Sequence, residues 1–128
     1  PNIFIIAPHP FYGKRVSLNR FLEQNIDLFD AIEYSWFHGK KFDKFNKKAK
    51  AIAKKHNKPL IATGDTHLPR YLNYTYSNLE GKKDIQGVFQ AIKDNKIEIV
   101  SRPIPFYKMP LIYAEMLIRE LYKKLLIK

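Results

Sequence analysis

The sequence contains no cysteine, which excludes disulfide bonds, thiolate metal ligands and a cysteine nucleophile. It also lacks an apolar run near the roughly 20 residues that a membrane-spanning helix needs. It has no basic, apolar leader of the kind that marks a signal peptide. We therefore expect a cytoplasmic protein without a membrane partner, in which any metal ion is held by His, Asp or Glu.

Acidic residues are few: 12 Asp and Glu stand against 23 Lys and Arg in 128 residues, a formal net charge of +11. Such an excess favours anionic partners, such as phosphorylated molecules or nucleic acid, without selecting among them. The apolar content of 45%, with 14% aromatic residues, is enough to build a hydrophobic core. The length fits one domain, because domains usually contain about 100–200 residues.

Short apolar runs alternate with helical patterns along the first half of the chain. This order is typical of a parallel sheet covered by helices, so we predict an α/β fold built from parallel β/α units. The predicted strands are residues 2–7, 30–35, 60–63, 74–79 and 97–100. The predicted helices are residues 18–24 with Ser17 as N-cap, 44–56 with Asp43 as N-cap, 85–93, and an amphipathic helix from 109 or 110 to 128.

Three residues with metal-ligating side chains follow predicted strands. His9 comes just after the first strand, and Asp65 and His67 come just after the third. Functional groups gather at the carboxyl ends of parallel strands, and residues i and i+2 of an extended segment point the same way. A set of nitrogen and oxygen donors without sulfur suits Zn, Mn or Fe. We predict that the three side chains converge on a metal ion. The alternative is that they are ordinary loop residues.

The same segments resemble a known family, the polymerase and histidinol phosphatase (PHP) domain. Ile-Ile-Ala-Pro-His-Pro at residues 5–10 is similar to the strand of that family which ends in His-Pro, and Asp-Ala-Ile-Glu-Tyr at 30–34 is similar to the next strand. Residues 59–67 resemble its Gly-Ser-Asp-Ala-His strand end, with Thr63 and Gly64 in place of the first Gly and the Ser. The resemblance covers residues 2 to about 100, the C-terminal half of the domain.

The resemblance implies a metal-dependent phosphoesterase on a distorted, seven-stranded TIM-like barrel. Residues 1–100 would be the C-terminal part of that barrel, and 101–128 a linker and the amphipathic helix. His9, Asp65 and His67 match metal-ligand positions, with no further catalytic residue in this chain. The remaining ligands of the family lie in an N-terminal half that the sequence lacks. We therefore expect the chain to be inactive alone and to join that half or another copy of itself.

Two arginines and three tyrosines near these motifs have two interpretations each. Arg15 and Arg70 are candidates for holding the phosphate of a small phosphorylated molecule or nucleotide, because Arg binds phosphate with two hydrogen bonds. They are equally well explained as surface charges. The aromatic residues either stack a nucleic-acid base or pack at the mouth of the barrel: Tyr71, Tyr74 and Tyr76.

Other polar residues have simpler explanations. Glu33 ends the second strand, and we expect its carboxylate to bind a lysine or a backbone amide rather than a metal. His38 and His56 lie in a polar loop and at a helix end, and we expect both to be solvated. The rival to an enzyme is a non-catalytic basic α/β module that binds nucleic acid or a partner protein.

Overall fold

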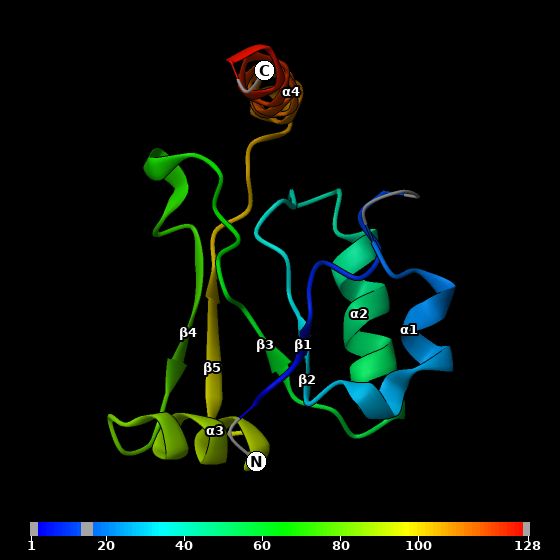
Figure 1. The fold of residues 1–128 in the computed structure, drawn as a ribbon, viewed down its shortest axis with the longest axis vertical. Helices are drawn as coiled ribbons and strands as arrows, with labels where there is room; N and C mark the ends of the chain where they lie inside the picture. Colours follow the sequence, from blue (N-terminus) through cyan, green and yellow to red (C-terminus); the bar gives the residue numbers. More distant parts are fainter. Residues whose placement is uncertain (1–2, 14–16, 127–128) are drawn as a thin grey trace.

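A computed structural model describes residues 3–13 and 17–126 and shows a mixed α/β fold with two small sheets (Figure 1). The parallel sheet has the order β1-β2-β3, and the antiparallel sheet pairs β4 with β5. The strands are β1 (Ile6–Ala7), β2 (Ala31–Glu33), β3 (Leu60–Ile61), β4 (Thr75–Leu79) and β5 (Ile97–Ser101). The helices are α1 (Arg20–Gln24), α2 (Lys44–Lys55), α3 (Ile85–Lys93) and α4 (Met109–Leu126).

The parallel sheet is packed on both faces, which confirms the predicted arrangement of the first three strands. On one face, Ile32 of β2 joins Leu22 of α1 and Ile52 of α2 in a buried apolar cluster. On the other face, Ala31 and Ile61 pack with Ile92 of α3. Alternate residues of β2 thus point to opposite faces, as the pleat of a strand requires. Short apolar strands buried on both faces are what a parallel sheet needs.

The antiparallel pair differs from the predicted series of parallel β/α units. Figure 1 shows α3 lying across the lower ends of β4 and β5 instead of running along the sheet. Because the helix stays at that end, β5 starts where β4 finishes and must run in the opposite direction. The backbone amide of Glu80 closes this end by donating to the carbonyl of Lys96 at 3.1 Å. The described residues therefore form two small sheets and no closed barrel.

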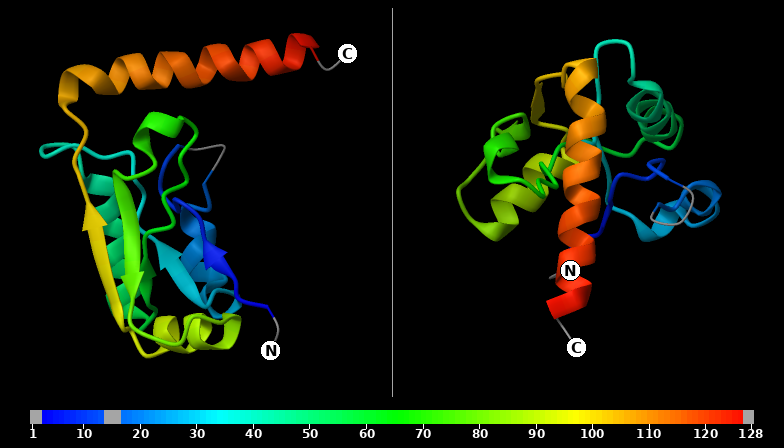
Figure 2. Two further views of the ribbon diagram at one scale, coloured as in Figure 1. Left: turned by 90° about the vertical axis from the view of Figure 1, so that its left-hand side faces the viewer. Right: turned by 90° about the horizontal axis from the view of Figure 1, so that it is seen from above.

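α4 crosses the top of the molecule, on the side where the chain leaves β5 (Figure 2). Near its start, Met109 and Ile112 are buried against Trp36, Leu68 and Ile104. Farther along, its apolar side chains are largely exposed, including Leu117, Ile118, Leu121 and Leu125. Within the described part of the chain, no helix has the length and apolar character to cross a membrane.

The start of α1 differs from the prediction. Ser17 is not the N-cap, because the helix begins at Arg20, after Asn19. The Ser17 hydroxyl instead donates to the carbonyl of His9 at 2.8 Å and to that of Tyr12, which holds the loop after β1. Asp43 precedes α2 as predicted but makes no capping hydrogen bond. The remaining elements lie within a few residues of their predicted bounds, apart from the first strand, which shortens to Ile6–Ala7.

Candidate functional site

The loops after β1 and β3 bring the three predicted metal ligands together. Asp65 lies between two imidazoles: its Oδ2 atom is 3.8 Å from Nε2 of His9, and its Oδ1 atom is 3.6 Å from Nε2 of His67. The exposed side-chain fractions are 26% for His9, 37% for Asp65 and 49% for His67, so solvent reaches all three. Each imidazole therefore faces a different oxygen of one carboxylate.

The backbone is strained at two of these three residues. His9 has a φ of +24° and Asp65 a φ of +30°, next to Gly64 at +89°. Asn, Asp and His enter positive φ more readily than other residues, and the three described asparagines there have φ values of +50° to +56°, whereas His9 and Asp65 lie below the usual left-handed range. Strain of this kind persists only where the surrounding structure holds it, and it concentrates at functional sites. Backbone conformation thus singles out the same two loops as the donor pattern.

Glu33, at the end of β2, fixes the two loops from between them. It is 2% exposed, and its Oε2 atom accepts a hydrogen bond from the backbone amide of His9 at 2.6 Å. Its Oε1 atom accepts from the hydroxyl of Thr63, just after β3. Burial raises the pKa of Glu33, against the lowering effect of the hydrogen bonds from Thr63 and His9. The prediction that Glu33 binds a backbone amide is confirmed.

Ser17 orients the His9 ring. Its oxygen is 3.4 Å from Nδ1 of His9, and its proton is already donated to backbone carbonyls. This pattern assigns the imidazole proton to Nδ1, which donates to Ser17. The lone pair then lies on Nε2, which faces Asp65. A histidine that binds a metal ion through one ring nitrogen usually donates a hydrogen bond from the other nitrogen, and that bond orients the ring.

The donor atoms are of the kinds that bind a divalent ion, but the three side chains are not close enough together to hold one. Tetrahedral zinc, with bonds of about 2.0–2.2 Å, separates its ligand atoms by roughly 3.3 Å. The two distances to Asp65 are 3.8 and 3.6 Å. Among residues 3–13 and 17–126, no group of three or more His, Asp or Glu side chains is gathered closely enough to hold a metal ion. Binding would therefore require the imidazoles to move inward.

A cavity of about 400 Å³, called here the His9 cavity, opens beside these residues. α4 contributes to it from the opposite end of the chain, through Tyr113 and Met116. Its walls are largely aromatic, with few polar groups, as in most sites for organic ligands. The lining residues are His9, Tyr12, Gly13, Ser35, Trp36, Phe37, Asp65, His67, Tyr113 and Met116.

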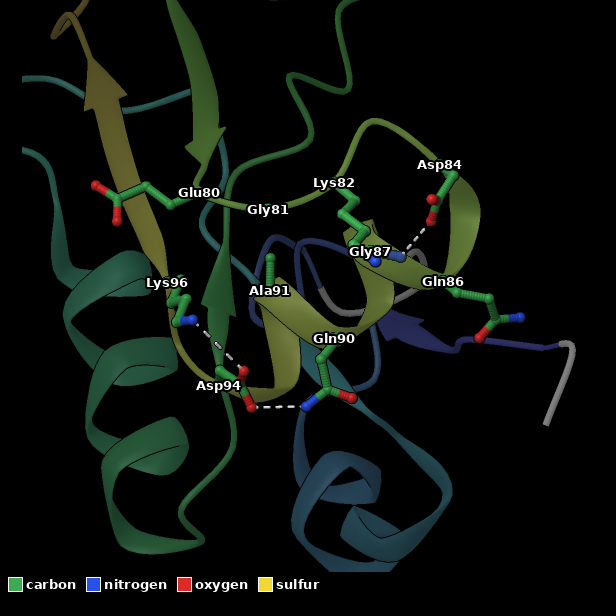
Figure 3. A pocket seen from close by; sticks show the side chains of 10 residues that line it. All are labelled: Glu80, Gly81, Lys82, Asp84, Gln86, Gly87, Gln90, Ala91, Asp94 and Lys96. Carbon is green, nitrogen blue, oxygen red and sulfur yellow. Dashed lines mark hydrogen bonds and ion pairs between the residues drawn. The ribbon is translucent and has the colours of Figure 1, made fainter.

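A cavity of similar size, about 430 Å³, lies at the other end of the molecule and is called here the α3 cavity (Figure 3). Two of its carboxylates have local partners: Asp84 accepts from the backbone amide of Gly87 at 2.7 Å, and Asp94 accepts from the side-chain amide of Gln90 at 2.7 Å. It contains no histidine. The lining residues are Glu80, Gly81, Lys82, Asp84, Gln86, Gly87, Gln90, Ala91, Asp94 and Lys96.

Arg70, one of the two predicted phosphate-binding arginines, is not among the residues that line the His9 cavity. Arg70 forms an ion pair with Glu115 of α4. Arg15 lies outside the described residues. Tyr71 is buried, with its ring centroid 5.4 Å from that of Trp36 and 4.9 Å from that of Tyr74. Tyr71 and Tyr74 therefore pack in the core beneath α4, and a role for Tyr71 in stacking a base is wrong.

The prediction that His38 is solvated is also wrong. The residue is 6% exposed, and its Nε2 atom is 2.7 Å from the hydroxyl oxygen of Ser101 at the end of β5. Burial lowers the pKa of His38, which the nearby carboxylate of Asp43 partly offsets. His56 caps the end of α2 and lies 3.3 Å from a carboxylate oxygen of Glu23. Pairing of His38 with Ser101 has no signal in the sequence, because the two lie on separate elements.

Sequence reasoning also missed the aromatic wall of the His9 cavity. Trp36 lies in the loop after β2, yet it is 2% exposed and central to the core beneath α4. For Tyr113, the sequence shows nothing beyond the amphipathic pattern of its helix.

No protein-family model matches the chain, and no curated protein matches it. The assignment of the candidate site therefore depends on the residues and geometry described above.

Proposed function

We propose that the chain is part of a metal-dependent phosphoesterase of the PHP type, in which His9, Asp65 and His67 hold a divalent Zn, Mn or Fe ion. The observation that carries this proposal is the carboxylate of Asp65 between two imidazole Nε2 atoms, on loops with strained backbones. A bound divalent ion supplies a water of lowered pKa as the nucleophile and neutralises charge on the phosphate oxygens.

The chain's own residues prepare this site. Asp65 offers one oxygen to each imidazole, and Glu33 fixes the backbone of His9 through its amide. Ser17 keeps Nε2 of His9 directed at Asp65. The aromatic walls of the His9 cavity suit the organic part of a small phosphorylated molecule or nucleotide, and α4 limits the access of water from above.

The proposal includes a second polypeptide, the N-terminal half of the same domain. β1 is an edge strand of its sheet, and Ile3 and Ile5 beside it are exposed. Exposed apolar edges are available for pairing with another strand. The N-terminal half would continue the sheet there and add the remaining ligands. Light scattering tests this association: we expect particles heavier than 15.1 kDa for the purified chain alone, through pairing of copies. A stable monomer at high concentration would contradict it.

Metal binding is the direct test of the site. Titration calorimetry with Zn²⁺ and Mn²⁺ on the chain should show one binding event that Asp65→Ala abolishes. Asp94→Ala, which removes a carboxylate from the α3 cavity, serves as the matched control and should leave binding unchanged. Phosphatase activity is then measured on the whole gene product with p-nitrophenyl phosphate. Equal metal binding by the wild type and Asp65→Ala would overturn the proposal.

A further inference from the structure

The outer face of α4 is apolar and uncovered. Figure 2 shows α4 crossing the top of the molecule, and no other element of the described chain lies above it. At 100° per residue, the face opposite the buried Ile112 carries residues at intervals of four, three and four. This spacing is the heptad pattern with which two helices pack in a coiled coil. The residues, called here the α4 seam, are all exposed: Ala114, Ile118, Leu121 and Leu125.

The side of α4 that faces the body of the protein carries charge as well as apolar residues. Glu115 forms an ion pair with Arg70, in the segment between β3 and β4, and a second one with Arg119 at 3.5 Å. An ordinary surface helix turns its apolar face to the core and its charged face to water. In this helix the seam points the other way. The arrangement indicates that the outer face packs against another polypeptide.

The seam and its neighbours expose more apolar surface than a monomer usually does. Leu117 and Tyr122 flank the seam and are also exposed. With the seam residues they offer on the order of 700 Å², above the roughly 300–600 Å² of the largest apolar patch on a typical monomer. Each partner in a stable complex of standard size contributes about 800 Å². This helix face alone therefore supplies most of the surface that a dimer needs.

We propose that the α4 seam is a dimerisation surface, on which α4 of a second copy of the chain packs in the antiparallel direction. Antiparallel pairing places Ala114 opposite Leu125 of the partner subunit, and Ile118 opposite the partner's Leu121. The smallest residue of the seam then meets a large one, and two-fold symmetry repeats each contact. Parallel pairing would instead place Ala114 against the partner's Ala114 and leave a gap that costs stability. Leu111 lies beyond the overlap of the two helices.

Analytical ultracentrifugation over a range of concentrations tests this dimer. Ile5→Lys places a charge at the β1 edge and disfavours pairing there, and in this variant we still expect a dimer of twice 15.1 kDa. Adding Leu125→Lys should raise the dissociation constant at least tenfold, because it places a charge inside the seam. The matched control is Leu126→Lys, which should change it less than threefold. Leu126 is 68% exposed and Leu125 74%, but Leu126 lies off the seam.

Two results would overturn the dimer. One is a monomer of 15.1 kDa at every concentration in Ile5→Lys, which would leave the outer face of α4 to a different partner. The other is equal weakening by Leu125→Lys and Leu126→Lys, which would reflect added charge alone. Circular dichroism checks that each variant is folded, and Ile3→Lys replaces Ile5→Lys if the latter unfolds.

The antiparallel direction has a separate test, because the sequence contains no cysteine. On oxidation, a mixture of Ala114→Cys chains and Leu125→Cys chains should form a cross-linked dimer, whereas either variant alone should not. Cross-linking of Ala114→Cys alone would overturn the antiparallel arrangement. Zn²⁺ binding should be the same in Leu125→Lys and the wild type, since the seam faces away from the His9 cavity. Failure of the dimer and failure of the metal site are thus distinguishable.

Discussion

The His9 cavity and the α3 cavity are nearly equal in volume, at about 400 and 430 Å³, yet they differ in how they are built. The α3 cavity is formed by one continuous stretch, residues 80–96, in which Asp84 and Asp94 accept hydrogen bonds from neighbouring amides of the same stretch. The His9 cavity is assembled from the loops after β1, β2 and β3 and from α4. Polar groups from distant segments, held by a strained backbone, mark a functional site more reliably than volume does.

Removal of one carboxylate from each cavity should give the largest difference, measured as phosphatase activity. We expect Asp65→Ala to reduce phosphatase activity of the whole gene product at least 100-fold, about 2.7 kcal/mol of transition-state stabilisation. Asp94→Ala should leave turnover within twofold, since Asp94 pairs with Gln90 and Lys96 in the α3 cavity. The measurement is the initial rate with saturating Mn²⁺ or Zn²⁺. Equal rates in the two variants would remove the distinction between the cavities.

The second prediction compares a buried and an exposed side chain of α4, the helix that covers the His9 cavity. Ile112 is 1% exposed and packs against the core, whereas its neighbour Leu111 is 69% exposed. Ile112→Ala should lower the free energy of unfolding by about 2–5 kcal/mol, the usual cost of such a cavity. Leu111→Ala should change it by less than about 0.5 kcal/mol. Urea denaturation followed by circular dichroism measures both, and similar midpoints would show that α4 is not docked.

At the α3 cavity, adding a side-chain atom should lower the stability of the protein. A Cβ atom at Gly87 would lie 2.4 Å from the carbonyl oxygen of Lys82, closer than atoms can approach. Gly87→Ala therefore forces residues 80–84 away from α3 and should cost about 1–3 kcal/mol of stability. Gln86→Ala on the same helix is the control. Metal binding should survive both changes, and its loss in Gly87→Ala would mean that the α3 cavity and the candidate metal site are coupled.

The smallest expected effect concerns His38, in the polar network of Ser101 and Thr75. Burial lowers the pKa of His38 below its ordinary value of 6.5, so the unfolded chain binds the proton more readily than the folded one. Its contribution to stability is therefore present above pH 6.5 and is lost as the pH falls through that value toward the lower folded pKa.

Urea midpoints of the wild type and His38→Gln, compared at pH 7.5 and 5.5, measure this effect. The variant should lose less stability than the wild type between the two values, because its amide does not titrate. His56→Gln is the control, as that residue is partly exposed at the end of α2. An unchanged pH dependence in His38→Gln would show that another group is responsible.

Local patterns were sufficient for most secondary structure. The apolar runs at residues 5–7, 31–33 and 60–61 predict strands, and helical spacing of apolar residues predicts α2, α3 and α4 within a few residues. The candidate ligands could be chosen for a similar reason: parallel strands end at one edge, so His9, Asp65 and His67 were expected near one another. The structure places them so, with Asp65 between the two imidazoles.

The direction of β5, the burial of Trp36 and His38, and the position of Tyr113 in the wall of the His9 cavity depend on tertiary structure alone. Periodicity reports which face of an element is apolar, because that is fixed by residues within one or two turns. It does not report which distant element covers that face. Local sequence patterns therefore identify the strands, the helices and the donor atoms. Packing of α3 across the strand ends and of α4 over the loops decided the cavities in which those donors lie.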